Sequence, residues 1–143
     1  MRCYIFDLDG TLFDVTHRLH HIRKTPKDWR AFYAACVDDP PIPHMVALAL
    51  DLSRCNHLVF VTGRSDEVRQ ETHDKLCDLD LIGHLFMRKE GDHRQDAIIK
   101  EEILAELKAQ GYEPIMAFDD RNQSVAAWRR LGVPCAQVDY GDF

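Results

Sequence analysis

The chain has 143 residues, 45% of them hydrophobic and 29% charged, which is typical of one globular domain rather than of a disordered or fibrous protein. The formal net charge of −6 at pH 7 argues against a protein that coats nucleic acid through bulk positive charge. The longest apolar run, residues 45–50, is too short to span a bilayer, and acidic Asp7 interrupts any signal sequence. We therefore expect one cytoplasmic domain, residues 1–143, with no membrane partner.

The cysteines indicate a reducing environment. There are five of them, an odd number, and no two form a C-x-x-C pair, so neither a disulfide framework nor a structural zinc site is expected. All five have apolar neighbours in the sequence, and we expect them to be free, buried thiols in the cytosol. They are Cys3, Cys36, Cys55, Cys77 and Cys135.

The pattern of the chain alternates between strands and helices. A buried strand is expected at residues 3–8, followed by a helix that begins with Thr25 as N-cap and Pro26 at its first position. A second helix at 43–54 leads into a strand at 57–61, after which Ser65 caps the next helix. The remaining elements are a strand at 85–88, a helix at 96–110, a strand at 115–118, a helix at 122–131 and a strand at 135–138.

Five strands separated by helices predict an α/β fold, a doubly wound parallel five-stranded sheet of the Rossmannoid kind. Such sheets bind ligands outside the carboxyl ends of their strands, where the strand order reverses. Polar clusters follow three of the expected strands, namely Asp7 with Asp9, the segment 62–64, and Asp119 with Asp120. The functional site is therefore expected at this edge of the sheet.

Four carboxylates follow two of these strands. Asp7 and Asp9 lie two residues apart after the first, and Asp119 and Asp120 follow another. Taken separately, either pair also fits a simpler interpretation, a turn after the strand or a helix N-cap. Four converging acids would repel one another strongly without a counter-ion, and ligation by oxygen atoms alone suits Mg²⁺.

The neighbouring residues suit an anionic oxygen group. Thr62, Gly63 and Arg64 supply a hydroxyl, a close backbone approach and a guanidinium fork, although T-G-R alone also fits an ordinary turn. Gly10 permits a turn that other residues disfavour, and Thr11 offers a hydroxyl and an amide. Together with the acids, these groups indicate phosphoryl transfer in which a carboxylate is the nucleophile.

Residues 7–12, D-L-D-G-T-L, resemble the first motif of the haloacid dehalogenase (HAD) superfamily of phosphatases. The resemblance implies that Asp7 is the nucleophile and Asp9 the acid/base, with Asp7 and the Asp9 carbonyl holding Mg²⁺. It also implies that Asp120 ligates the metal with support from Asp119. Lys100 matches the lysine of the third motif, although a solvated lysine on a helix face would look the same.

A closer resemblance is to the 3′-phosphatase domain of bacteriophage polynucleotide kinase. It is carried by residues 91–96, 100–103, 118–123, 128–133 and 141–143. It implies that Arg18 and Arg64 contact phosphate and that Asp96, four residues before Lys100 on one helix, is a further functional acid. The residues assigned to the phosphate group of the substrate are thus Gly10, Thr11, Arg18, Thr62, Gly63, Arg64 and Asp96.

Two features depart from that domain. No Gly is followed by Lys, so the phosphate loop of a kinase is absent and no 5′-kinase activity is expected. The segment 17–29 does not match that domain beyond Arg18. Residues 13–42 as a whole are expected to form a small flap with a helical insertion. In this flap, residues 18–30 carry five basic side chains interleaved with Trp29 and histidines, which suits a small nucleic-acid groove. The alternative, which we favour for the aromatic residues, is an amphipathic helix that buries Trp29, Phe32 and Tyr33 in the core.

The motifs predict a Mg²⁺-dependent phosphomonoesterase that works through an aspartyl-phosphate, and the resemblance implies that it removes 3′-phosphate from DNA or RNA ends. A separate kinase or ligase is then an expected partner, since removal of a 3′-phosphate leaves a hydroxyl that can be sealed. One alternative is a phosphatase of free nucleotides or other small phosphomonoesters, and transfer to an acceptor other than water also stays open. An alternative of another class is a non-catalytic module that binds nucleic-acid ends.

Overall fold

A single sheet of five parallel strands forms the centre of the molecule in the computed structural model, which describes residues 1–143. The strand order is β3-β2-β1-β4-β5, and every pairing is parallel. The strands are β1 (Arg2–Phe6), β2 (His57–Ser65), β3 (Gly83–Arg88), β4 (Glu113–Asp119) and β5 (Cys135–Gln137). The predicted doubly wound α/β sheet is confirmed.

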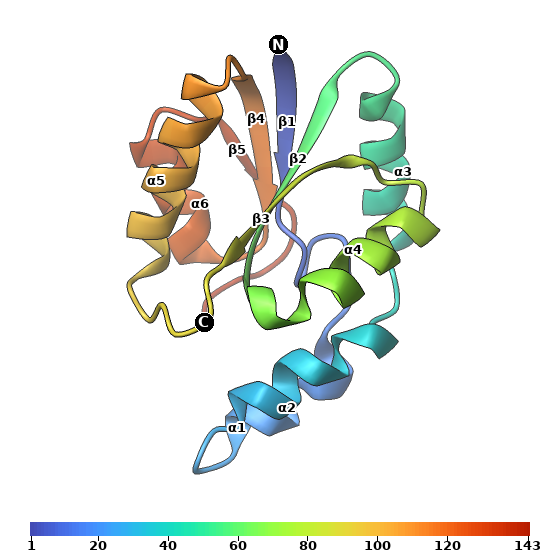
Figure 1. The fold of residues 1–143 in the computed structure, drawn as a ribbon, viewed down its shortest axis with the longest axis vertical. Coiled ribbons are helices and arrows are strands. Elements are labelled where there is room, and N and C mark those ends of the chain that lie inside the picture. Colours follow the sequence, from blue (N-terminus) through green and yellow to red (C-terminus); the bar gives the residue numbers. More distant parts are fainter.

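Helices cover both faces of the sheet (Figure 1). One core includes Phe6, Phe60 and Met45 and lies under α3 and α4, whereas the other includes Ile5, Leu107 and Trp128 and lies under α5 and α6. The helices are α1 (His20–Arg23), α2 (Trp29–Ala34), α3 (Pro43–Ser53), α4 (Arg69–Asp78), α5 (Asp96–Ala109) and α6 (Asn122–Arg130). None of these helices combines the length and the hydropathy needed to cross a membrane.

The order of the strands brings distant residues together. β1 lies between β2 and β4, so the chain reverses its direction across the sheet at β1, and the crevice of such folds opens there. Asp7 directly follows β1, and Asp119 is the last residue of β4. The two strands pair in parallel, with Phe6 opposite Phe118, so their carboxyl ends lie side by side. Both acids therefore lie at the same carboxyl edge of the sheet.

The flap differs from its prediction in two ways. Its main helix, α2, begins at Trp29 with Asp28 as N-cap, whose carboxylate accepts a hydrogen bond from the Ala31 amide at 3.0 Å, so Thr25 is not the cap. An additional short helix, α1, precedes it. Figure 1 shows α1 and α2 projecting beyond the carboxyl ends of the strands, at the edge where the acids lie.

Two cysteines also differ from expectation. Cys3, Cys36 and Cys135 are buried, as predicted, but Cys55 and Cys77 are exposed. Cys55 follows the end of α3 and Cys77 lies near the end of α4, positions at which apolar neighbours in the sequence do not imply burial in the core. All five thiols are free.

The last residues of the chain pack against the turn that carries Asp120. The Gly141 carbonyl accepts a hydrogen bond from the Asn122 amide at 2.8 Å. A Cβ at Gly141 would lie 1.9 Å from the Asp120 carbonyl oxygen and 2.6 Å from Cα of Arg121. Because both contacts are with backbone atoms, only glycine fits at this position without a shift of the turn.

We expect Gly141→Ala to lower the free energy of unfolding by about 1–3 kcal/mol, the usual cost of forcing an extra carbon into a packed site. Urea unfolding monitored by circular dichroism measures this change. Asp142→Ala, at an exposed neighbouring position, is the matched control and should change the stability by less than about 0.5 kcal/mol. Equal stabilities for the two variants would contradict the close packing.

Candidate active site

Three carboxylates meet at the carboxyl edge of the sheet. One oxygen from each of Asp7, Asp119 and Asp120 lies within 4.8 Å of the other two. Two of the acids are otherwise held in place: the Asp7 carboxylate accepts from the Thr11 hydroxyl at 3.3 Å, and the Asp119 carboxylate accepts from the Trp128 ring N–H at 3.3 Å. The three acids therefore form a small, oxygen-lined cluster.

The protein matches the negative charge of this cluster only in part. Burial, followed by the charges of Asp119, Asp120 and Asp9, raises the pKa of Asp7 well above its ordinary value. Burial also raises the pKa of Asp119 to about 6, although Lys100 acts in the opposite direction, and burial raises the pKa of Asp120 as well. Acids held this way take up either protons or a cation.

Gly10 makes room for one of the three acids. Its φ is +80°, a conformation that favours glycine, and a Cβ here would lie 2.1 Å from an Asp120 carboxylate oxygen and 2.7 Å from its Cγ. The Asp120 carboxylate thus lies against the Gly10 backbone. Gly10 is needed for the turn after β1 and for the approach of the acid from β4.

Lys100 supplies positive charge from the side of α5. Its ammonium group is buried, donates to the Asp96 carboxylate at 3.3 Å and lies 5.8 Å from the centre of the Trp128 ring. Asp96 also accepts from Arg88 and lies 3.7 Å from the Arg121 guanidinium group. Burial would raise the pKa of Asp96, but these three cations outweigh it and lower the pKa. Asp96 thus pairs with three basic side chains and holds Lys100 beside the acidic cluster.

Asp9 lies apart from the three clustered acids. One of its carboxylate oxygens, Oδ1, accepts from Arg64 Nε at 2.7 Å and from Arg18 Nη2 at 3.0 Å. The side chain of Asp9 is 26% exposed, and no hydrogen bond occupies its second oxygen, Oδ2. Two carboxylates separated by one residue therefore have different surroundings: Asp7 faces other acids, whereas Asp9 faces two arginines.

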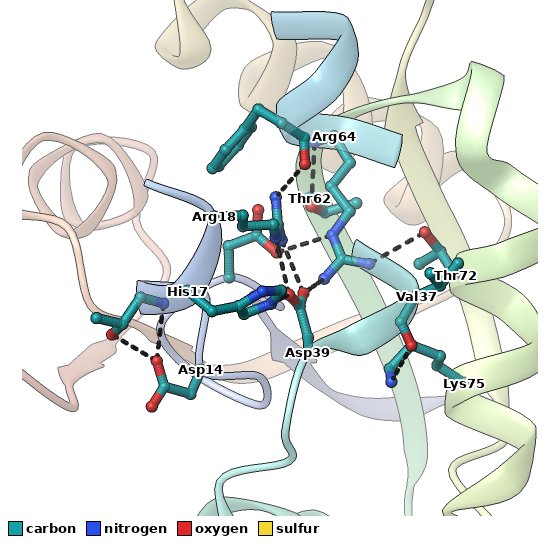
Figure 2. A network of polar contacts seen from close by, with 12 residues as sticks. Asp14, His17, Arg18, Val37, Asp39, Thr62, Arg64, Thr72 and Lys75 are labelled. Atoms are coloured by element: carbon teal, nitrogen blue, oxygen red, sulfur yellow. Dashed lines mark hydrogen bonds and ion pairs between the residues drawn. The ribbon is translucent and has the colours of Figure 1, made fainter. Parts of the chain in front are cut away.

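Asp39 completes the contacts of both arginines, as Figure 2 shows. It accepts two parallel hydrogen bonds from Arg18 at 2.8 Å each and one from Arg64 Nη2 at 2.8 Å. Its Oδ1 also lies 2.7 Å from His17 Nε2. The side chains of Arg18, Arg64 and Asp39 have no exposed surface, and we call the group formed by Asp9, Arg18, Asp39 and Arg64 the arginine clamp.

The end of β2 aims Arg64 into the clamp. Pairing with β3 is irregular between Thr62 and Ser65, and a bulge of this kind redirects a side chain. The Thr62 hydroxyl accepts from the Arg64 amide at 3.1 Å, and the Arg64 guanidinium group donates to the buried Thr72 hydroxyl at 3.1 Å. Gly63 faces Asp96, since a Cβ there would lie 3.7 Å from its carboxylate.

The residues predicted from the sequence thus fall into two neighbouring groups. The first consists of Asp7, Thr11, Lys100, Asp119 and Asp120, and the second of Asp9, Arg18 and Arg64. Arg18 and Arg64, which were predicted to contact phosphate, bind carboxylates in the structure. Their side chains have no exposed surface, so neither guanidinium group faces an open cavity. Asp96 joins the first group through Lys100.

Sequence reasoning missed Asp39 and Thr72. The stretch Asp38-Asp39-Pro40-Pro41 is typical of a helix end, so nothing in the local sequence indicated a buried carboxylate there. Asp39 nevertheless pairs with Arg18 and Arg64, which are 21 and 25 residues away in the chain. One signal was present: two arginines predicted at one site need acidic partners beyond Asp9 if they are buried. Trp128 was noticed only as part of a resembling stretch, and its contact with Asp119 had no sequence signal.

The fold resembles that of known proteins. A family model, the polynucleotide kinase PNKP phosphatase domain, matches residues 1–143. A chain from a structure of the Pnkp1/Rnl/Hen1 RNA repair complex is 30% identical with a TM-score of 0.84, covering 99% of this chain and 43% of its own length. A chain from a second structure of the Pnkp1/Rnl/Hen1 complex is 31% identical with a TM-score of 0.81, covering 99% and 47%. The present chain therefore spans less than half the length of these two proteins.

More distant structures share the fold alone. A haloacid dehalogenase-like hydrolase from Streptococcus pneumoniae, SP0104, is 15% identical with a TM-score of 0.71, covering 97% of this chain and 85% of its own. The resemblance to HAD phosphatases and to polynucleotide kinase phosphatase domains is thereby confirmed. The chain belongs to the family of polynucleotide kinase PNKP phosphatase domains and is a phosphomonoesterase with a HAD-like fold.

Proposed function

We propose that this chain removes 3′-phosphate groups from polynucleotide ends in a Mg²⁺-dependent reaction through a phosphoenzyme at Asp7. The observation that carries the chemistry is the separation of two neighbouring acids. Asp7 lies among carboxylates beside Lys100, whereas Asp9 is held by two arginines with one oxygen free. Such a pair supports a nucleophile and a proton donor in one site.

The acidic cluster fits a hard divalent cation. Its donors are carboxylate oxygens only, and the raised pKa values of Asp7, Asp119 and Asp120 reflect negative charge that Lys100 matches only in part. Asp119 already accepts from Trp128 and from the Arg121 amide, so Asp120 is the freer of the two to bind metal. When bound, Mg²⁺ would offset the charge of the carboxylates and of the phosphoryl group.

In the first step, a carboxylate oxygen of Asp7 attacks the phosphorus atom and the bond to the ester oxygen breaks. Asp9 Oδ2 gives its proton to the departing oxygen, because the arginines already occupy Oδ1. In the second step Asp9 takes a proton from water, which attacks the phosphorus of the Asp7 acyl phosphate and releases inorganic phosphate. Lys100, fixed by Asp96, offers positive charge beside the phosphoryl group.

Two observations support the proposal that the substrate is a polynucleotide. The family is that of polynucleotide kinase phosphatase domains, and two similar chains come from structures of the Pnkp1/Rnl/Hen1 complex, described in one case as an RNA repair complex. No large lid covers the site; the only insertion is the small flap. By analogy with those complexes, we also propose that the chain acts together with a separate kinase or ligase in nucleic-acid repair.

The first test compares phosphate release from a 3′-phosphorylated oligonucleotide, its 5′-phosphorylated isomer and free mononucleotides, each with Mg²⁺. We expect preference for the 3′-phosphorylated end, loss of activity with chelator, and no turnover by Asp7→Asn. An unchanged circular dichroism spectrum of Asp7→Asn shows that the fold is intact. Turnover by a clean preparation of this variant would rule out the phosphoenzyme, and equal rates on mononucleotides would rule out the polynucleotide substrate.

The second prediction concerns pH and metal. The folded pKa values of Asp7, Asp119 and Asp120 are raised, so the folded metal-free protein holds these protons more tightly than the unfolded chain does. This cluster therefore makes the chelated protein gain stability as the pH falls from 7 through about 6, the pKa of Asp119. At pH 7, Mg²⁺ at 100 times its Kd should add about 2.7 kcal/mol, a Tm increase of roughly 5–10 °C.

Asp120→Asn separates the metal from general effects of salt. Removing one charge from the cluster should raise the Tm in chelator at pH 7 while abolishing most of the increase caused by Mg²⁺. Asp142→Asn, which removes an exposed charge, is the control. A full Mg²⁺-dependent increase in Asp120→Asn would contradict metal binding by this cluster.

The third prediction concerns the arginine clamp. Asp39→Asn removes the negative charge that anchors the Arg18 and Arg64 guanidinium groups. Without this anchor the two arginines no longer hold Asp9 in a fixed orientation. We expect kcat/KM for a nucleoside 3′-phosphate, whose alkoxide needs a proton, to fall about 10- to 100-fold, within the usual contribution of a general acid. The loss should be much smaller for p-nitrophenyl phosphate, because its leaving group departs unprotonated.

Asp38→Asn, at the exposed neighbouring position, is the control and should retain both activities. Breaking a buried ion pair costs about 3–5 kcal/mol, so Thr72→Val, which removes a single hydrogen bond to Arg64, serves as a milder variant if Asp39→Asn is unfolded. Equal losses on both substrates would assign Asp39 a purely structural role.

A further inference from the structure

An exposed tryptophan lies on the flap. Trp29, the first residue of α2, is 47% exposed, contrary to the interpretation that places it in the core. Phe32 is buried and Tyr33 half-buried, and the three rings contact one another at centroid distances of 5.7 to 5.9 Å. Only Phe32 therefore acts as the core residue predicted for all three, and nearly half of the Trp29 surface stays exposed.

Tyr33 connects this ring to the active site. It lies four residues after Trp29, so both side chains are on one face of α2. Burial, together with the nearby charges of Asp9 and Asp96, raises the pKa of the Tyr33 hydroxyl although Arg88 opposes this change. Tyr33 follows Phe32, whose carbonyl and ring contact Arg18, the arginine that donates to Asp9. Trp29 and Tyr33 therefore lie on the helix that the arginine clamp holds at the site.

The surroundings of Trp29 are positively charged. Residues 19–30, which exclude the buried Arg18, contain four exposed basic side chains and a single acid, in a chain whose net charge is −6. The ammonium group of Lys27 lies 5.8 Å from the centre of the Trp29 ring, and Lys24 and Arg30 are exposed nearby in the chain. Positive charge beside the exposed Trp29 ring suits a ligand that combines phosphates with flat rings.

The flap is fixed rather than loosely attached. Arg18 Nη1 donates to the Phe32 carbonyl at 3.2 Å, and its guanidinium carbon lies 4.3 Å from the centre of the Phe32 ring. The same guanidinium group binds Asp9 and Asp39. Farther along the flap, Lys75 of α4 donates to the Val37 carbonyl at 2.9 Å. The position of α2 is therefore set by the same clamp that orients Asp9.

We propose that Trp29 and Tyr33 form a stacking platform for bases of a single-stranded polynucleotide near its phosphorylated 3′ end, with the basic residues of the flap contacting its backbone phosphates. This inference rests on the proposed function, because it concerns the same substrate. It adds a binding site for the bases next to the phosphate group, and it makes the flap the part of the chain that distinguishes a strand from a small phosphate ester.

The test combines a change in the protein with a change in the substrate. Two 3′-phosphorylated oligonucleotides are compared, one with normal thymine bases and one with abasic sites at the three nucleotides nearest the 3′ end. Trp29→Ala should lower kcat/KM on the normal substrate roughly 5- to 150-fold, the range for loss of one stacked base. Abasic sites should lower the wild-type value similarly, and the two changes combined should lower it little further.

Two variants control for the fold. Trp29→Phe keeps an aromatic face and should retain most of the activity, and Ile82→Ala changes an 80% exposed apolar residue just before β3, at the opposite edge of the sheet. Equal losses on both oligonucleotides, or no loss on either, would overturn the stacking platform while leaving the proposed function intact. Wild-type activity on mononucleotides but not on oligonucleotides would instead overturn the proposed function.

A binding measurement decides the platform without turnover. Tryptophan fluorescence is titrated with an unphosphorylated thymine oligonucleotide, and the signal of Trp29→Phe is subtracted to remove Trp128, which is buried. We expect saturable quenching that weakens with added salt and is absent with the abasic oligonucleotide. Quenching that is unchanged by removal of the bases would contradict stacking.

Discussion

Two arginine side chains with no exposed surface lie beside Asp9, and burial of their charge constrains the rest of the structure. A guanidinium group removed from water needs a nearby anion and hydrogen-bond acceptors. Asp39 provides both for Arg18 and Arg64, and Asp9 provides the remainder through one oxygen. Two guanidinium groups thus share the carboxyl oxygens of Asp39 and Asp9, and the geometry of the clamp fixes the strand end, the flap and the acid between them.

The acidic cluster differs from the arginine clamp, because its negative charges are only partly matched by cations. Asp7, Asp119 and Asp120 lie together, while the nearest buried cation, Lys100, is shared with Asp96. Burial and mutual repulsion raise the pKa of Asp7, so the metal-free site stores unfavourable energy that a bound cation would relieve. Positive charge accompanies Asp9, the proposed proton donor, whereas negative charge is left unbalanced around Asp7, where we propose that a metal and a phosphoryl group bind. The backbone places these two environments only two residues apart.

Local sequence signals predicted most of the sheet and the acidic cluster. The pattern of an apolar strand ended by acids spans only a few residues, which explains why β1, β4 and the residues Asp7 and Asp120 were found. Asp39 was not found, because its partners are 21 and 25 residues away and the adjacent prolines gave a sufficient local explanation. Trp29 was misassigned for a related reason: helical spacing shows that residues share a face, but not whether another element covers that face.

The contacts of Arg18 also bear on how a long substrate would be positioned. A single guanidinium group touches Asp9, Asp39 and the carbonyl and ring of Phe32, so the flap and Asp9, the proposed proton donor, are fixed in one frame. In enzymes with mobile lids, closure both excludes water and completes the site. Here α2 is already tied to the groups at the site, so a strand lying along it would be positioned without a closing motion.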